Sequence, residues 1–485
     1  MPYFDLAPTM SSVNSRGSSV FDLPTHSHAF SEDGPSTSGP LPDEVRDPQY
    51  PFRNQGPSFI VVSGGTGCNS IVSAFGNACY VLPVSDDGGS SSEIIRVIGG
   101  PSIGDIRSRL VRLIPPAPMN SPLDRIRNLL AYRLPANCSE SEARDEWREI
   151  VEGRSALWTG IPNDRKEMIR GFLVHFENEV LKRAHKNFSF LNGSIGNYFL
   201  SAAQEFFRSL PSAIFLFSSI TNSQANIVPV IVTNHTVTIA AELENGSRLV
   251  GQCEISHPVH LGDASHGLSI TLSGEEELSE DDLEGTIEAP RNVLFESAKK
   301  DEYEPIGARI TRLYYINAYG SEIHPSPNPD YLHNLNVKDI LVYSCGSLWT
   351  SIVPCLALRG VASAIATSRS LRAKVLLLNS QNDRETDGYT AFDYVETIAR
   401  TLNAPYHTPY GGLKNANTIY PISAFVTHLV YLEGTTIEVD VPKITAKGVK
   451  CIKVLGTRDE KTAVPKFDAE SVQKGIIEIL EQDVA

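Results

Sequence analysis

The sequence predicts an α/β protein with a doubly wound, mostly parallel sheet that carries helical and β-hairpin insertions. Three observations favour this fold. Strand-like runs, turns and helix-like runs alternate from about Pro57 onward, as expected of a parallel sheet flanked by helices. Glycine-rich turns follow two of the strand-like runs, where such folds hold their ligands. The 485 residues, 41% of them hydrophobic, allow one large domain with insertions or three smaller domains.

Residues 1–57 and about 262–305 are expected to be disordered. The first segment is rich in Ser, Pro and Gly, and the second is crowded with carboxylates, so neither has a core-forming pattern. The folded domain is therefore expected at 58–485. Within it, charged helix-like sequence at about 135–190 predicts a helical insertion, whose apolar stripe is Ile169, Phe172, Leu173, Phe176, Val180 and Leu181.

The first expected strands are Phe59–Val62 and Tyr80–Val84, because both are short apolar runs that end in turn residues. Farther along, Asn245-Gly246 between two strand-like runs predicts a β-hairpin with a type I′ turn.

Alternation then resumes with strands at 338–344 and 374–380 and a helix at 348–358. Asp468 is placed to cap a final helix, which has one apolar stripe: Val472, Ile476, Ile479 and Leu480.

Composition excludes several classes of partner. A formal net charge of −15 argues against electrostatic binding to nucleic acid or to an anionic membrane. The seven cysteines are scattered and never spaced C-x-x-C, which favours reduced thiols over disulfides or zinc. No signal peptide is recognised and no apolar run approaches the roughly 18 residues of a membrane span. The sequence thus predicts a cytoplasmic protein with a small-molecule ligand, and a homo-oligomer is compatible with it.

The first glycine loop consists of Gly64, Gly65, Thr66 and Gly67. It follows a strand and opens a helix-like run, where backbone N–H groups and the helix dipole can hold a phosphate. It is not a Walker A loop, and Ser70 stands where a dinucleotide fingerprint would have its last glycine. A phosphate-binding loop and a plain tight turn both remain open on this pattern.

The second loop pairs two carboxylates, Asp86 and Asp87, with small hydroxyl residues that include Ser90. Asp86 lies about 20 residues after the first glycines, as does the acid that binds a ribose hydroxyl in dinucleotide folds. The pair also suits Mg²⁺ or the orientation of a reacting hydroxyl, so both residues are candidate catalytic and metal-binding groups. The third interpretation of this pattern is an ordinary Asp-Gly turn.

Further polar loops are candidates for binding the same ligand, because the carboxyl ends of parallel strands share one edge of a sheet. They supply an acid with a phosphate-matching guanidinium, small polar residues before a helix, and a Gly-Ser turn after a strand. These residues are Asp105 and Arg107, Ser194 and Asn197, and Gly346 and Ser347.

Together the motifs resemble those of the CofD-like family, which contains 2-phospho-L-lactate transferases and YvcK-type gluconeogenesis factors. From about Ser58 to Val395 the chain has, in the family's order, "GGTG", "SDDGGSSS", "GDIRSRL", "NGSIGN", "KDILVYSCGSLWTSIVP" and "NSQNDRETDGYTAFDYV". The residues of the second motif are more similar to those of the YvcK branch.

The resemblance implies a Rossmann-like domain that binds a nucleotide or nucleotide-sugar, with Mg²⁺ in the transferase branch. It also implies that Asn379, Glu385, Thr386 and Asp387 border the pocket. Three functions follow as alternatives. They are a phospho-group transferase, in which a deazaflavin hydroxyl attacks a nucleotide-activated phospholactate, a non-catalytic sensor of a UDP-sugar, and an NAD(P) oxidoreductase. The last is the weakest, because the second loop is acidic and the fingerprint glycine is missing.

Overall fold

The computed structural model describes residues 56–65, 67–257, 305–405, 418–460 and 462–482. The predicted disordered segments at 1–57 and 262–305 fall almost wholly outside these ranges, and Thr66 does too.

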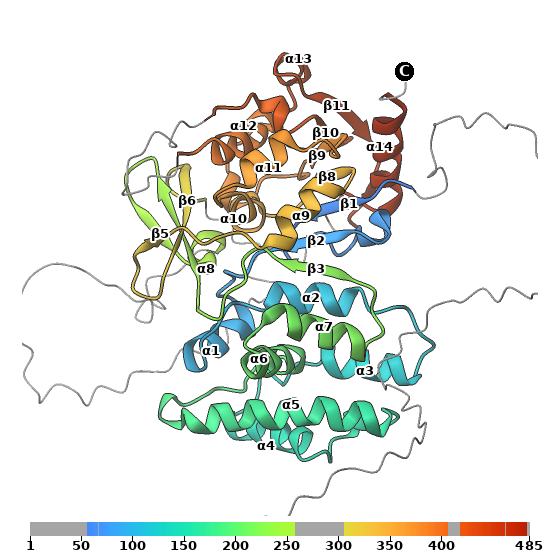
Figure 1. Cartoon of the computed structure of the whole chain (residues 1–485), viewed down its shortest axis with the longest axis vertical. Helices are drawn as coiled ribbons and strands as arrows, with labels where there is room; N and C mark the ends of the chain where they lie inside the picture. Colours follow the sequence, from blue (N-terminus) through green and yellow to red (C-terminus); the bar gives the residue numbers. More distant parts are fainter. Residues whose placement is uncertain (1–55, 66, 258–304, 406–417, 461, 483–485) are drawn as a thin grey trace, which may run out of the picture. The chain divides into compact units, whose positions relative to one another are not determined.

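A seven-stranded sheet, parallel throughout, forms the core and confirms the predicted doubly wound α/β fold. Its strand order is β11-β10-β9-β8-β1-β2-β3 (Figure 1). Almost every strand residue is buried except along the edge strand β11, which explains the near-continuous apolar runs in the sequence. The strands are β1 (Phe59–Val62), β2 (Cys79–Leu82), β3 (Asn226–Pro229), β8 (Ile340–Tyr343), β9 (Ala373–Leu377), β10 (His428–Leu432) and β11 (Lys450–Val454).

β1 lies at the point where the strand order reverses. It pairs with β2 on one side, as at Ile60 and Cys79, and with β8 on the other, as at Ile60 and Leu341. From β1 the chain winds outward to β2 and β3, and from β8 outward to β11. The crevice beyond the carboxyl ends of β1 and β8 is therefore the place where this kind of sheet binds ligands.

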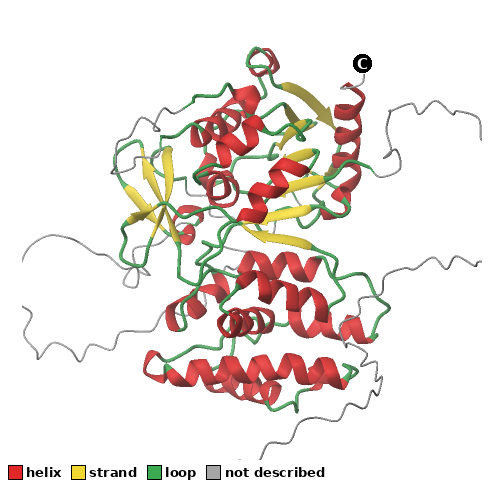
Figure 2. Ribbon diagram, in the orientation of Figure 1, coloured by secondary structure: helices red, strands yellow, loops and turns green. Residues whose placement is uncertain are grey.

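The chain between β2 and β3 is helical, as Figure 2 shows in red. In Figure 1 the helices form successive layers: α2 and α7 contact β3, α6 contacts α7, α5 contacts α6, and α4 contacts α5. The helices are α1 (Gly89–Val97), α2 (Gly104–Arg112), α3 (Pro122–Ala131), α4 (Glu140–Val151), α5 (Asn163–Lys182), α6 (Ile195–Phe207) and α7 (Leu210–Ile220).

An apolar core between α4, α5 and α6 holds this helical part together. The ring centroid of Tyr198 lies 4.4–6.0 Å from those of Trp147, Phe176 and Phe190. The predicted stripe on α5 is buried at Ile169, Leu173, Phe176 and Val180 and half-buried at Phe172, but Leu181 is 57% exposed. Val180, one residue earlier, is buried, and the rotation of about 100° per residue along the helix turns Leu181 toward solvent.

A four-stranded antiparallel sheet, ordered β5-β4-β6-β7, adds to the α/β core. The predicted hairpin at Asn245-Gly246 is present, but its turn type was wrong. A type I′ turn needs positive φ at both residues, whereas only Gly246 has one, at 83°. Leu243 and Ser247 close a three-residue loop instead. The strands are β4 (Thr238–Leu243), β5 (Arg248–Val250), β6 (Ile310–Ile316) and β7 (Glu322–Ile323).

The C-terminal half completes the domain. The predicted helix after β8 begins as a π-helix, η7 (Leu348–Ile352), a form often found at functional sites. At the last helix, α14, Asp468 accepts a hydrogen bond from the Ser471 backbone at 2.7 Å, so the predicted cap is confirmed. The remaining elements are α8 (Gln252–Ser256), α9 (Pro329–Val337), α10 (Val353–Leu356), α11 (Val361–Thr367), α12 (Ala391–Leu402), α13 (Val441–Thr445), α14 (Ala469–Gln482), β12 (Thr457–Arg458) and β13 (Pro465–Lys466).

Among the described residues, no single helix has the length and apolar composition to cross a membrane. One pair, Leu348–Leu356 and Val361–Thr367, passes that test together by length and composition, with a bend of 81° between its two parts.

Candidate functional site

A cavity of about 990 Å³ opens at the carboxyl edge of the sheet, over the switch point between β1 and β8. Its size suits a cofactor or a nucleotide-sized ligand. The loops after β1, β2, β8 and β9 form most of its wall, and α8 and the β12–β13 segment complete it. Nine of the residues predicted from the sequence line it: Gly64, Gly65, Gly67, Asp86, Asp105, Gly346, Ser347, Asn379 and Glu385.

The glycines of the first loop are needed because this loop packs closely against both α2 and the β8 loop. A Cβ atom added at Gly65 would lie 2.6 Å from the Cα of Asp105, and one at Gly67 would lie 2.7 Å from the carbonyl oxygen of Cys345. Both contacts are closer than real Cβ atoms allow. The loop therefore touches α2 on one side and the β8 loop on the other.

Arg109, which the sequence reasoning missed, supports this loop from inside the protein. Its guanidinium is fully buried and donates from Nη2 to the Gly64 carbonyl at 3.0 Å and to Ser63 Oγ at 3.1 Å. It also lies 4.9 Å from the centre of the Tyr80 ring. Its position four residues after Asp105 on a helix could have indicated that both face the same loop.

Asp86 and Asp105 place two carboxylates in the cavity. Burial, together with the charge of Asp87, raises the pKa of Asp86 to about 6. Burial, together with the charge of Asp86, raises the pKa of Asp105 to about 7. The Gly88 and Gly65 backbone N–H groups oppose these shifts by donating to the two carboxylates. Mutual repulsion of buried carboxylates is the condition that a divalent cation relieves.

Asp87 points to a different place. Its Oδ1 accepts a hydrogen bond from the Cys253 backbone at 2.9 Å, at the start of α8, and Asp87 does not line the cavity. A Cβ atom at Gly251 would collide with the same carboxylate. The side chain therefore joins the second loop to α8, while its neighbour Asp86 faces the ligand space.

The β8 and β9 loops are tied together by Asn379. Its amide accepts from the Gly346 backbone at 2.8 Å and donates back to the Gly346 carbonyl at 2.7 Å. Glu385 then accepts from the Thr350 hydroxyl at 2.7 Å, from two backbone N–H groups of η7 at 3.2 Å, and from Ser347. Burial and the charge of Asp383 raise the pKa of Glu385 to about 8.

The other two residues predicted to border the pocket do not line it. Thr386 is fully buried, and its hydroxyl donates to Asp383 at 2.7 Å. Asp387 is exposed.

Four further predicted residues form a separate group beside the cavity. Asn197 donates from Nδ2 to Ser90 Oγ at 2.6 Å and accepts from Arg107 Nε at 3.2 Å. Ser194 is fully buried three residues earlier. None of the four lines the cavity.

Parts of the cavity wall could not be found from sequence motifs. Gln252, Ser256 and residues 464–468 close the side of the cavity away from the glycine loops. These segments have ordinary composition and come from distant parts of the chain, so only folding brings them to the glycine loops.

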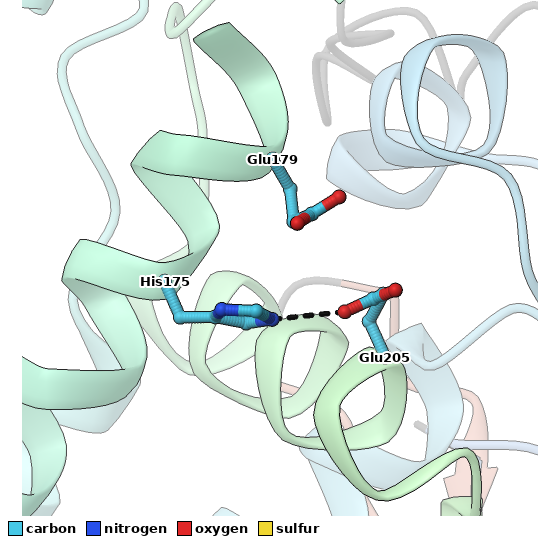
Figure 3. Close-up of side chains that lie close together, drawn as sticks. All are labelled: His175, Glu179 and Glu205. Carbon is cyan, nitrogen blue, oxygen red and sulfur yellow. Dashed lines mark hydrogen bonds and ion pairs between the residues drawn. The ribbon is translucent and has the colours of Figure 1, made fainter. Parts of the chain in front are cut away.

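Among the residues that the structure describes, one other cluster of metal-ligand type joins α5 to α6 (Figure 3). His175 Nε2 lies 2.9 Å from Glu205, and Glu179 lies close to both. Lys182 and Arg183 already pair with Glu179 at 2.5 and 2.6 Å, and Arg208 pairs with Glu205 at 2.9 Å. These cations compensate the carboxylates, so the cluster fits an ion-pair network between the two helices.

Comparisons with known proteins agree with this fold and with the predicted resemblance. Residues 59–481 match the family model of 2-phospho-L-lactate transferase CofD. The uncharacterized protein YNL011C of Saccharomyces cerevisiae is 35% identical over 454 residues, which cover 87% of this chain and 98% of the yeast protein. A putative gluconeogenesis factor of Aquifex aeolicus is 19% identical over 433 residues, covering 88% of this chain and 97% of that protein.

A solved structure shows the same fold. The crystal structure of a UPF0052 family member from Bacillus halodurans has a TM-score of 0.54 and 19% identity, and it covers 87% of this chain and 99% of its own. The family match spans nearly all of the described domain, and the yeast relative has a similar length. This protein therefore belongs to the CofD family.

Proposed function

We propose that the cavity binds a nucleotide or a nucleotide-sugar, with its diphosphate over Gly64, Gly65 and Gly67 and with Mg²⁺ at Asp86 and Asp105. The observation that carries this proposal is the convergence of the β1 and β8 loops at the switch point, opposite two carboxylates. The two carboxylates, with pKa values raised by burial and repulsion, fit a divalent cation. Bound there, Mg²⁺ would neutralise diphosphate charge.

We propose transfer of a phospho-group as the reaction, similar to that of a 2-phospho-L-lactate transferase. Phosphoryl transfer mainly requires that the protein position the reacting groups and neutralise their charge, and the glycine loops and carboxylates can do both. The acceptor hydroxyl forms the new P–O bond, the bond to the nucleotide leaving group breaks, and the acceptor's proton passes to a base.

The second candidate is a non-catalytic, cytoplasmic regulator that senses a UDP-sugar. Curated relatives named gluconeogenesis factor favour it. A sensor needs the same phosphate loops as an enzyme, so the loops alone do not separate the two functions.

Titration calorimetry with UDP-sugars, GDP, GTP and NAD(P) tests the nucleotide proposal, and mass spectrometry of what co-purifies identifies the natural ligand. We expect saturable, Mg²⁺-dependent binding of one nucleotide class. Turnover of a nucleotide-activated phospho-donor would select the transferase, and binding without turnover would select the regulator. A folded sample that binds no nucleotide would rule out both, and hydride transfer with bound NAD(P) would favour the oxidoreductase.

Mg²⁺ affinity is expected to weaken as the pH falls from about 8 to about 5.5, by up to roughly tenfold per pH unit for each proton displaced. The cause is competition, because Asp86 and Asp105 take up protons below pKa values of about 6 and 7 and then cannot hold the cation. Mg²⁺ titrations at several pH values, with nucleotide present, measure the effect. An affinity that is flat across this range would contradict the assignment of the cation to this pair.

A further inference from the structure

Two arginines flank the start of α6, and neither forms an ion pair with a carboxylate of the described residues. Arg107 lies on α2, and its Nε donates to the Asn197 side chain at 3.2 Å. Arg133 follows α3, and its Nη1 donates to the Asn192 carbonyl at 3.1 Å. Both partners are neutral, so two full positive charges lack a counter-charge.

The backbone brings the two side chains to the same turn. Arg133 forms an antiparallel bridge with Ser194, and the Ile195 N–H donates to the Tyr132 carbonyl at 3.1 Å. On the other side, a Cβ atom at Gly196 would lie 3.0 Å from Cγ of Arg107. Glycine at this position therefore lets the Arg107 side chain cross the first turn of α6.

Three sources of positive potential meet here. Burial, together with the charge of Arg133, lowers the pKa of Arg107 to about 10. The third source is the N-terminus of the 13-residue helix α6, whose N-cap Ser194 makes no capping hydrogen bond with its side chain. The Ser194 hydroxyl is buried without a hydrogen-bond partner.

Such an arrangement is costly unless an anion completes it, because buried polar groups and clustered like charges need partners. The place is reachable, since Arg133 is exposed and Arg107 is half-buried. Two guanidinium forks beside the positive end of a helix dipole match a tetrahedral dianion better than they match a single carboxylate.

We propose that Arg107, Arg133 and the start of α6 bind the phosphate group of a small phosphomonoester, at a site separate from the large cavity. Neither arginine lines that cavity. The site does not depend on the proposed nucleotide function, and it could hold a co-substrate or a regulatory metabolite of the same chemistry.

Calorimetry of the full chain with glycerol 3-phosphate and with inorganic phosphate tests the site. We expect saturable binding of both, with glycerol 3-phosphate at least as tight, and a loss of affinity of at least about tenfold in Arg107→Gln and in Arg133→Gln. Arg148→Gln is the matched control, because it removes one charge from an exposed ion pair on α4. We expect it to bind like the wild type.

Absence of saturable binding, or equal affinity in wild type and both variants, would overturn the proposal. Binding of inorganic phosphate alone would overturn the phosphomonoester assignment. Displacement of phosphate by a nucleotide would place the anion in the large cavity. That result would also overturn the proposal of a separate site. Because these phosphate titrations need no nucleotide, their failure is distinguishable from failure of the nucleotide proposal.

Thermal unfolding separates a ligand site from a structural arginine pair. Without phosphate, Arg133→Gln is expected to melt at the same temperature as the wild type or higher, since it removes repulsion. Phosphate should raise the melting temperature of the wild type and of Arg148→Gln but not of Arg133→Gln. A clear loss of stability in phosphate-free Arg133→Gln would assign the arginine a structural role instead.

Discussion

Asp105→Asn is expected to weaken Mg²⁺-dependent nucleotide binding by at least about tenfold, since an amide keeps the shape of the side chain but not the charge that holds the cation. If the protein is a transferase, turnover should fall by roughly 10²–10³, the range seen when one group that stabilises transition-state charge is removed. Nucleotide titrations with and without Mg²⁺ measure the first effect.

The same variant should be as stable as the wild type, or more stable, at pH 8 without Mg²⁺. The folded-state pKa of Asp105, about 7, lies above the value of about 3.9 expected for an unfolded chain. The folded wild type therefore binds the proton more tightly, and it loses stability as the pH rises from about 4 through 7. Asp105→Asn lacks that loss, so a large drop in melting temperature at pH 8 would contradict a ligand-binding role.

Asp87→Asn is the matched comparison, because it removes a neighbouring carboxylate that points to α8. We expect its Mg²⁺ response to stay within about twofold and its free energy of unfolding to change by less than about 0.5 kcal/mol, because the amide oxygen of Asn can still accept the hydrogen bond from the Cys253 backbone. Equal loss of Mg²⁺ dependence in Asp87→Asn and Asp105→Asn would support the sequence prediction that Asp87 also binds the metal.

Gly65→Ala is expected to lower the free energy of unfolding by about 1–3 kcal/mol and to weaken nucleotide binding at least about tenfold. The added methyl group would lie 2.6 Å from the Cα of Asp105, which belongs to the backbone of α2 and cannot move as a flexible side chain would. Either the first glycine loop or α2 must shift. Either shift displaces the backbone N–H groups of the loop, which are proposed to face the diphosphate. Chemical denaturation and nucleotide titration measure the two effects.

Gly171→Ala is the control for this substitution. Gly171 is exposed inside α5, and nothing lies within 4 Å of its added Cβ. The alanine should therefore stabilise the protein by about 0.5–1 kcal/mol through helix propensity and leave nucleotide binding unchanged. Gly65→Ala with stability and affinity equal to those of the wild type would contradict the close contact between the first loop and α2.

The sequence was sufficient to predict the strands and helices that are marked by a local residue pattern. Apolar runs followed by small or polar turn residues located β1, β2, β8 and β9, and the Asp468 cap located the start of α14. Family motifs that keep their order along the chain identified the family. The hairpin was also predicted from a local signal, Asn-Gly between two strand-like runs. Its turn type was missed because Asn-Gly permits more than one kind of loop, and the strand register selects among them.

Only the tertiary structure decided which polar residues share a site. Asp86 and Asp87 are neighbours with the same side chain, yet one faces the cavity and the other caps α8, because successive residues after a strand point in different directions. Arg107 and Asp105 are separated in the same way on α2, and Arg107 and Arg133 both lie against the start of α6. Long-range packing sets these directions, and residue type and spacing along the chain do not encode them.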